Sequence, residues 1–185
     1  CKRFVYISSS MVYGDFKTNK VTEKSDVNPK EAYGTMKLAG EIITKGVSKL
    51  NDIPYTIIRP SAVYGPTDMN RRVSQIFIEN AFTNKEIMIE GKDEKLDFTF
   101  IDDTVEAITR LINYPPTKDK AFNKIYPDPS SSWAKHQIYN IGNGNPISLL
   151  NFIKILEKEL DKSAIKELYP MPPGDVIKTY ADTEK

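Results

Sequence analysis

The amino-acid sequence predicts an α/β fold that contains a parallel β-sheet. Residues 4–8 and 55–59 are short apolar runs with the composition of buried strands. Between them, residues 32–50 have the length and apolar spacing of a helix, with Asn28-Pro29 before it and Asn51-Asp52 after it. A strand, a helix and a second strand in this order are typical of a parallel sheet, because parallel neighbours need a crossover between them.

The alternation of elements continues beyond the second strand. Before residue 114 we predict a helix over 72–83, strands over 86–89 and 97–101, and a helix over 104–112. Asp102 or Asp103 can cap the last of these helices, and this structural role is the preferred interpretation of the acidic pair. Residues 114–133 contain four prolines and a run of three serines, which favours an exposed insertion. After it we predict a strand over 137–141, a turn over 142–146, a helix capped by Ser148 that ends near residue 160, and an extended proline-rich tail over 169–175.

The composition favours one soluble globular unit. The chain has 185 residues, of which 39% are hydrophobic and 28% charged, so it can bury one substantial core. Its formal charge of +1 gives no field that would attract nucleic acid or an anionic membrane. The single cysteine, Cys1, and the single histidine, His136, exclude an intrachain disulfide and a Cys/His metal site. A reducing, cytoplasmic setting fits this composition, and His136 is expected to pack at the surface.

Tyr33 and Lys37 are the strongest candidates for chemistry. A phenol titrates near pH ~10, so it is a poor base at neutral pH unless a neighbouring cation stabilises the phenolate. Residues four apart on a helix face the same way, which places the Lys37 ammonium beside the Tyr33 phenol. The hydroxyl of Ser9, at the end of the first predicted strand, can hold the oxygen of a substrate. These three residues therefore predict a proton-transfer site for an alcohol.

The spacing Tyr-x-x-x-Lys is weak support by itself. It occurs three times in the sequence, whereas chance predicts about one occurrence for this composition. The other two matches begin at Tyr13 and Tyr114, and they are interrupted by a turn and by two prolines, respectively. Only Tyr33 and Lys37 lie within a predicted helix.

Five motifs follow one another along the chain. They are Ser8-Ser-Ser-Met-Val-Tyr-Gly14, Tyr33-Gly-Thr-Met-Lys37, Arg59-Pro-Ser-Ala-Val-Tyr-Gly-Pro66, Asp97-Phe-Thr-Phe-Ile-Asp-Asp103 and Tyr139-Asn-Ile-Gly142. In this order they resemble the extended short-chain dehydrogenase/reductase family, and within it the NAD-dependent nucleotide-sugar epimerases and dehydratases. The resemblance covers nearly the whole chain apart from the predicted insertion. It implies the C-terminal part of a Rossmann-like parallel sheet together with a small α/β substrate-binding domain.

The resemblance also implies a division into domains. Residues 1–66 are expected to form part of the dinucleotide-binding domain and to carry the catalytic residues, while residues 67–185 form mainly the substrate-binding domain. The segments 97–112 and 137–142 are expected to return to the parallel sheet. A dinucleotide site needs a glycine-rich turn after its first strand, and this sequence contains none that qualifies. The chain is therefore expected to be the C-terminal portion of such an enzyme and to be inactive when isolated.

An activity is implied as well. In this family, bound NAD takes hydride from a sugar carbon while the tyrosine removes the hydroxyl proton, and the hydride then returns to the other face of the transient ketone. Tyr33 corresponds to this acid/base, Lys37 to the residue that stabilises it and holds the nicotinamide ribose, and Ser9 to the residue that binds the reacting oxygen. Ser8 and Pro60 are the further residues expected to contact the cofactor, which is NAD with NADP as the alternative.

The residues after Ser9 favour epimerisation. Related dehydratases carry an Asp-Glu pair there and related decarboxylases keep a Glu, whereas this chain has Ser10 and Met11. The preferred prediction is therefore NAD-dependent epimerisation of a nucleotide-linked sugar at C4. A dehydratase or reductase of the same family is one alternative. A catalytically inactive fragment or an interaction module is the other, if no N-terminal half exists.

The residues expected to bind the nucleotide-sugar are Ser9, Ser10, Met11, Ser61, Ala62 and Arg72. Ala62 stands where many epimerases have Asn or Thr against the sugar nucleotide, and Leu96 where many have an arginine for the diphosphate. Arg71 or Arg72 can supply that cation instead, because a guanidinium matches phosphate oxygens. No metal site and no nucleic-acid or membrane partner are expected. For the full-length protein we expect a homodimer, with three residues of the tyrosine-bearing helix at its interface: Gly40, Ile43 and Val47.

Overall fold

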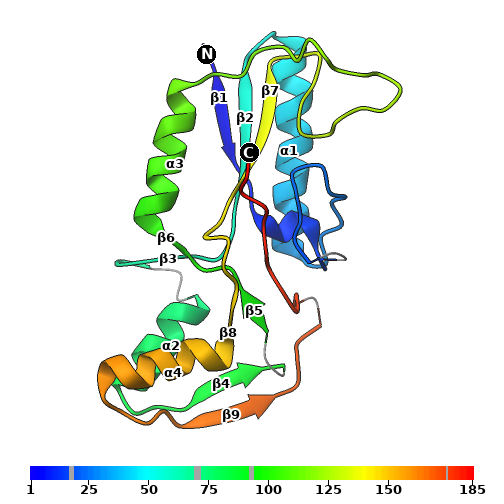
Figure 1. The fold of residues 1–185 in the computed structure, drawn as a ribbon. Helices are drawn as coiled ribbons and strands as arrows, with labels where there is room; N and C mark the ends of the chain where they lie inside the picture. Colours follow the sequence, from blue (N-terminus) through cyan, green and yellow to red (C-terminus); the bar gives the residue numbers. More distant parts are fainter. Residues whose placement is uncertain (17–18, 69–71, 92–93, 174) are drawn as a thin grey trace.

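The computed structural model describes residues 1–16, 19–68, 72–91, 94–173 and 175–185, and a three-stranded parallel sheet forms its upper part in Figure 1. The strands are β1 (Phe4–Ile7), β2 (Tyr55–Pro60) and β7 (His136–Ile141), in the order β1-β2-β7. Tyr55 pairs with Phe4 on one side and with His136 on the other. The parallel sheet expected from the sequence is confirmed, and each of the three strands lies within one residue of its predicted limits.

β2 is the central strand of the sheet, and its mostly apolar and β-branched residues suit this buried position. Tyr55, Ile57 and Ile58 are fully buried, because strands flank β2 on both edges and helices cover both of its faces. β-Branched and aromatic side chains suit this pleated environment. Arg59 is buried too, so β2 carries one charge into the interior.

His136 begins β7 and is buried, with 2% of the residue exposed. Its imidazole stacks on the ring of Tyr55, with the ring centroids 4.5 Å apart and the planes 20° from parallel. The surface position expected from the sequence is wrong. The reason is that residue 136 already belongs to the sheet and pairs with Tyr55 across it, which no local pattern in the preceding loop indicates.

The helix α1 (Ala32–Leu50) has the limits that the sequence predicts. Glu31 caps its N-terminus, because its carboxylate accepts hydrogen bonds from the backbone N–H groups of Tyr33 and Gly34. The predicted start signal at residues 28–29 therefore precedes the true cap, whereas Asn51 ends the helix as expected. α1 packs against β1 and β2 on one side of the sheet (Figure 1).

The helix α3 (Ile101–Asn113) lies on the opposite side of the sheet and begins three residues earlier than the sequence predicts. The expected strand over 97–101 is consequently reduced to the two-residue β6 (Thr99–Phe100). Asp102 and Asp103 lie in the first turn of α3, and the cap residue is Phe100. The capping role predicted for the two aspartates is wrong. Both carboxylates nevertheless lie near the N-terminus of α3, where the positive end of the helix dipole stabilises negative charge.

A smaller α/β layer lies below the sheet in Figure 1. It consists of α2 (Val73–Phe82), α4 (Leu149–Leu160) and a parallel pair of strands, β4 (Ile87–Glu90) and β9 (Lys166–Tyr169). Ser148 caps α4 as predicted, by accepting a backbone N–H bond of 3.2 Å. Phe77, Ile87 and Ile153 are buried together in the core of this layer. The domain boundary at residue 66 stays a prediction.

Several short elements have no counterpart among the sequence predictions. They are the 3-10 helix η1 (Ser10–Tyr13), β3 (Val63–Tyr64), β5 (Lys95–Leu96), β8 (Ile147–Ser148) and β9. Residues 114–133 form a long excursion at the upper right of Figure 1, where Ile125 and Tyr126 are 79% and 82% exposed. Its end is not exposed, since Ser130 and Ser132 are buried. Among the described residues, no helix combines the length and the apolar character needed to cross a bilayer.

Candidate active site

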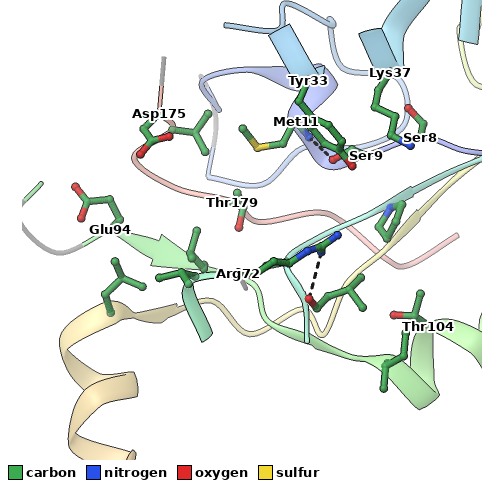
Figure 2. Close-up of a pocket in the computed structure, with 18 of the residues that line it drawn as sticks. Ser8, Ser9, Met11, Tyr33, Lys37, Arg72, Glu94, Thr104, Asp175 and Thr179 are labelled. Carbon is green, nitrogen blue, oxygen red and sulfur yellow. Dashed lines mark hydrogen bonds between the residues drawn. The ribbon is translucent and has the colours of Figure 1, made fainter. Parts of the chain in front are cut away.

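A cavity of about 870 Å³ lies at the carboxyl ends of β1 and β2, between the parallel sheet and the smaller layer. This edge is where open α/β sheets bind ligands, and small-molecule sites typically enclose roughly 300–1,000 Å³. Residues that follow β1 and β2 form part of the wall, and α1, α2, α3, β4, β5, the start of α4 and the C-terminal segment also contribute side chains. Figure 2 shows these side chains converging on one space.

Tyr33 and Lys37 lie one turn apart on α1, and both line the cavity. The Nζ atom of Lys37 is 5.5 Å from the centroid of the Tyr33 ring and donates a 2.9 Å hydrogen bond to the Ile7 carbonyl. Tyr33 is 43% exposed, so its phenol is accessible to a ligand. The structure thus brings the predicted phenol and the predicted cation together at the end of β1.

Ser9 follows β1 and is the N-cap of η1. Its Oγ accepts a 3.2 Å hydrogen bond from the Met11 backbone N–H. This bond uses a lone pair of the oxygen, and the hydroxyl hydrogen is left to donate to a ligand. Figure 2 shows the Ser9 hydroxyl and the Tyr33 phenol against the same part of the cavity wall.

The residues selected from the sequence fall into two groups. Eight of them line the cavity: Ser8, Ser9, Met11, Tyr33, Lys37, Pro60, Ala62 and Arg72. Ser10 and Ser61 are buried and do not belong to the lining. The Oγ atom of Ser61 has no hydrogen-bond partner within the described residues. Arg71, the alternative to Arg72, lies outside the described residues, and the binding roles of all these side chains stay predictions.

Charged and polar side chains also line the part of the cavity away from Lys37. The Nη1 atom of Arg72 donates to the Val63 carbonyl at 3.2 Å. In Figure 2, Glu94 and Asp175 lie on the side opposite Lys37. Sequence reasoning did not identify Glu94 as a site residue, because it belongs to no motif and reaches the cavity only through the tertiary fold.

A buried ion pair lies behind Tyr33 and Lys37. Glu41 on α1 receives two hydrogen bonds from Arg59 on β2, with Nε–Oε1 at 2.9 Å and Nη2–Oε2 at 2.7 Å. The Ser8 hydroxyl donates to the same Oε1 atom at 2.6 Å. The Glu41 side chain is fully buried, and that of Arg59 is 3% exposed. This bidentate pair fixes the helix that carries Tyr33 to the central strand.

The network continues through Tyr13 and Asn140. Arg59 Nη1 donates to the Tyr13 hydroxyl at 2.9 Å, and this hydroxyl donates to Oδ1 of Asn140 at 2.7 Å. Burial raises the pKa of Tyr13 by more than the nearby Arg59 lowers it, so Tyr13 is a neutral phenol at pH 7. Burial would lower the pKa of Arg59, but its bonds to Glu41 and Tyr13 reverse the direction and raise it. Arg59 therefore remains charged.

Sequence reasoning missed the pair of Glu41 and Arg59, although each residue carries a signal. Arg59 interrupts an otherwise apolar strand, and a charge in a buried strand needs a partner. Glu41 stands one turn after Lys37, on the same side of α1. Joining these two signals requires the packing of α1 against β2, which no local pattern specifies.

Residues 1–142 match the family model described as "NAD dependent epimerase/dehydratase family". The chain is 35% identical to Protein CapI of Staphylococcus aureus over 99% of this chain and 55% of that protein. It is 30% identical to a probable UDP-glucuronate 4-epimerase of Rhizobium meliloti (strain 1021) over 99% of this chain and 54% of that protein. The chain therefore spans about half the length of these relatives.

A solved structure shows the same fold. The structure of UDP-glucuronic acid 4-epimerase from Bacillus cereus, in complex with UDP-glucuronic acid and NAD, matches with a TM-score of 0.82 and 31% identity. The match covers 97% of this chain and 52% of that one. The Rossmann-like α/β architecture and the family resemblance that the sequence indicates are both confirmed. The chain belongs to the NAD-dependent epimerase/dehydratase family.

Proposed function

We propose that the protein containing this sequence is a cytoplasmic, NAD-dependent nucleotide-sugar 4-epimerase. The observation that carries the proposal is the position of Lys37 Nζ, 5.5 Å from the centroid of the Tyr33 ring, in the wall of a cavity that Ser9 also lines. The relatives from Rhizobium meliloti and Bacillus cereus support C4 as the reacting carbon and a uridine diphosphate sugar as the substrate. The free thiol of Cys1 fits a reducing compartment.

Three side chains divide the proton chemistry in this proposal. Tyr33, as its phenolate, takes the proton of the C4 hydroxyl of the sugar. The charge of the Lys37 ammonium stabilises the phenolate, and the bond to the Ile7 carbonyl keeps the ammonium in place. Ser9 donates its hydroxyl hydrogen to the same sugar oxygen while negative charge develops there.

The cofactor would meet this chain at the same end of the cavity. NAD, when bound, accepts hydride from the sugar carbon and gives it back. Tyr33, Lys37, Ser8 and Pro60 are the lining residues assigned to the nicotinamide end. The chemistry of Lys37 fits a ribose, because an ammonium has three N–H donors and the Ile7 carbonyl occupies one of them.

The surroundings of Ser9 support epimerisation over the elimination of water. Met11 lines the cavity next to Ser9, and elimination needs an additional acid or base at such a position. The carboxylates of Glu94 and Asp175 lie away from Tyr33 in Figure 2. With Met11 in place of an acid or base next to Ser9, loss of water from a ketone at C4 is not promoted at this position, and return to the alcohol is favoured.

The experiment uses the protein translated from the complete reading frame that contains this sequence. Purified protein is denatured to identify released NAD or NADP, and UDP-glucuronic acid and UDP-glucose are then followed by proton NMR for inversion at C4. Tyr33→Phe should lower kcat at least about 100-fold without a change in the melting temperature. Tyr114→Phe is the matched control, because this phenol is 77% exposed, does not line the cavity and should keep both catalysis and stability.

Three results would overturn the proposal. If the Tyr33→Phe variant kept most of the activity, Tyr33 could not be the acid/base of the reaction. A 4-keto-6-deoxy sugar as the main product would favour the dehydratase alternative. Absence of both NAD and NADP from the purified protein, and of any binding on titration, would favour an interaction module.

A homodimer of the full-length protein is part of the same proposal. Ile43 and Val47 on α1 are 65% and 53% exposed, which supports their place at a helical interface. An added Cβ at Gly40 would meet Tyr6 of β1, so Gly40 lies against the sheet, and its place at the interface stays a prediction. Ile43→Lys should convert the dimer to a monomer in light scattering, and an unchanged mass would contradict this interface.

A further inference from the structure

Tyr6 on β1 has no part in the proton transfer proposed above, yet it lies against the lysine of the site. Lys37 Nζ is 5.8 Å from the centroid of the Tyr6 ring and 5.5 Å from that of the Tyr33 ring. The ammonium is therefore in contact with two aromatic rings, and its 2.9 Å hydrogen bond to the Ile7 carbonyl is a third contact. Tyr6 and Ile7 are neighbours in β1, so one strand provides two of the three contacts.

The Tyr6 ring is held in place by the helix that it faces. A Cβ atom at Gly40 would lie 2.0 Å from the Tyr6 hydroxyl oxygen and 2.4 Å from its Cζ atom, so the tip of the ring touches the backbone of α1. Glycine permits this close approach because it has no side chain. The ring also packs on the buried cluster of Tyr55, Ile57 and Ile138. Tyr6 therefore cannot turn away without disturbing the sheet or the helix.

Tyr6 can hold a cation without competing with Tyr33 for the proton. Burial raises the pKa of Tyr6, and the neighbouring Glu41 and Tyr33 raise it further. At pH 7 it is a neutral phenol, and the face of a neutral aromatic ring attracts an ammonium within about 6 Å. The stem of Lys37 is flexible, so such contacts decide where its charge resides.

We propose that Tyr6 is a positioning residue for Lys37, and that its ring and the Ile7 carbonyl together hold the ammonium against Tyr33. This inference rests on the proposed function, in which Lys37 stabilises the Tyr33 phenolate. The Tyr6 ring limits the conformations of the lysine side chain that carry the charge away from Tyr33. The role belongs to the aromatic ring and not to its hydroxyl group.

Two variants separate the ring from the hydroxyl. Tyr6→Phe keeps the ring and should keep kcat within about twofold, whereas Tyr6→Leu removes the ring and should lower kcat about tenfold at an unchanged KM for the nucleotide-sugar. Ile138→Val is the control for lost packing, because Ile138 belongs to the same cluster but lies on β7, which β2 separates from the strand that binds Lys37. It should lower the melting temperature and leave kcat unchanged.

A second measurement does not depend on activity. In the full-length protein labelled with 13Cε-lysine, the Lys37 ε-methylene protons should show a ring-current shift that Tyr6→Phe preserves and Tyr6→Leu reduces. An unchanged shift in Tyr6→Leu would overturn the inference, whatever the enzyme does. Equal losses of kcat in Tyr6→Phe and Tyr6→Leu would overturn it as well. If the protein is not an epimerase, the NMR comparison still tests the position of Lys37 by itself.

Discussion

Glu41 and Arg59 are joined by two hydrogen bonds in the interior of the protein, and the Ser8 hydroxyl donates to the same carboxylate. Removing two charges from water is costly, so a buried pair of this kind is weak support for stability by itself. Its consequence is geometric. α1 cannot rotate or slide against β2 without breaking both bonds, and the direction in which Tyr33 and Lys37 face is thereby fixed.

Replacing only one of Glu41 and Arg59 should therefore destabilise the folded protein more than replacing both residues. Glu41→Leu leaves the buried Arg59 guanidinium without its carboxylate partner, and Arg59→Leu leaves the buried Glu41 carboxylate without its guanidinium partner. Each single variant should lose roughly 3–5 kcal/mol of the free energy of unfolding. The double variant should lose clearly less than the sum, because it buries no unpaired charge. Urea unfolding of the four proteins at pH 7 measures the coupling, and strictly additive losses would contradict it.

The contrast between α1 and this pair shows what could be predicted from the sequence. The limits of α1 follow from local signals, because its apolar spacing is periodic and Asn51 ends it. The approach of Lys37 to Tyr33 follows from the helical period alone. The partner of Arg59 could not be predicted, because it depends on how two elements pack against each other.

Other parts of the fold and the site were missed for related reasons. β9 (Lys166–Tyr169) consists of exposed residues, so it has no alternating apolar pattern that would indicate a strand. The start of α3 was predicted three residues too late, because residues 97–103 carry both strand and capping signals. In the structure the chain is helical from Ile101 onward. Glu94 and Thr179 enter the cavity from segments far apart in the sequence. Such residues carry no local signature.

Replacing Gly40 and Gly46 of α1 by alanine should change the free energy of unfolding in opposite directions. An added Cβ at Gly40 would meet the Tyr6 hydroxyl, whereas one at Gly46 would meet no atom within 4 Å. Gly46→Ala should raise the free energy of unfolding by about 0.5–1 kcal/mol, because alanine has the higher helix propensity. Gly40→Ala should lower it by about 1–3 kcal/mol, because Tyr6 must move out of a packed site. Thermal and urea unfolding test both changes, and a gain at Gly40 would contradict the contact with Tyr6.

Ala62 has a backbone conformation that disfavours its own side chain. It lines the cavity between β2 and β3 with φ at 35°, in the left-handed region. Such a conformation costs an alanine about 1–2 kcal/mol relative to glycine, part of which the greater freedom of an unfolded glycine offsets. Ala62→Gly should thus raise the free energy of unfolding by up to about 1 kcal/mol. Ala39→Gly, at an exposed position of α1, is the matched control and should lower the free energy of unfolding by about 1 kcal/mol. Losses in both variants would refute the strain at Ala62.

His136 should make the stability of the protein depend on pH. Burial, followed by the charge of Lys45, lowers the pKa of His136 to about 3. In the unfolded chain this imidazole titrates near ~6.5, so between these two pH values the unfolded state binds one more proton than the folded state. The free energy of unfolding therefore falls as the pH falls below about 6.5, by up to about 1.4 kcal/mol per pH unit.

His136→Phe tests this dependence, because it keeps a ring over Tyr55 and removes the titrating group. His136 is the only histidine of the chain, and measurements between pH 7 and 5.5 stay above the range in which most carboxylates titrate. Over this interval, wild-type protein should lose about 1 kcal/mol more of its free energy of unfolding than the variant does. Urea unfolding at four or more pH values measures the two slopes. Parallel slopes would mean that the folded protein accepts the proton as readily as the unfolded chain, and would contradict the lowered pKa of His136.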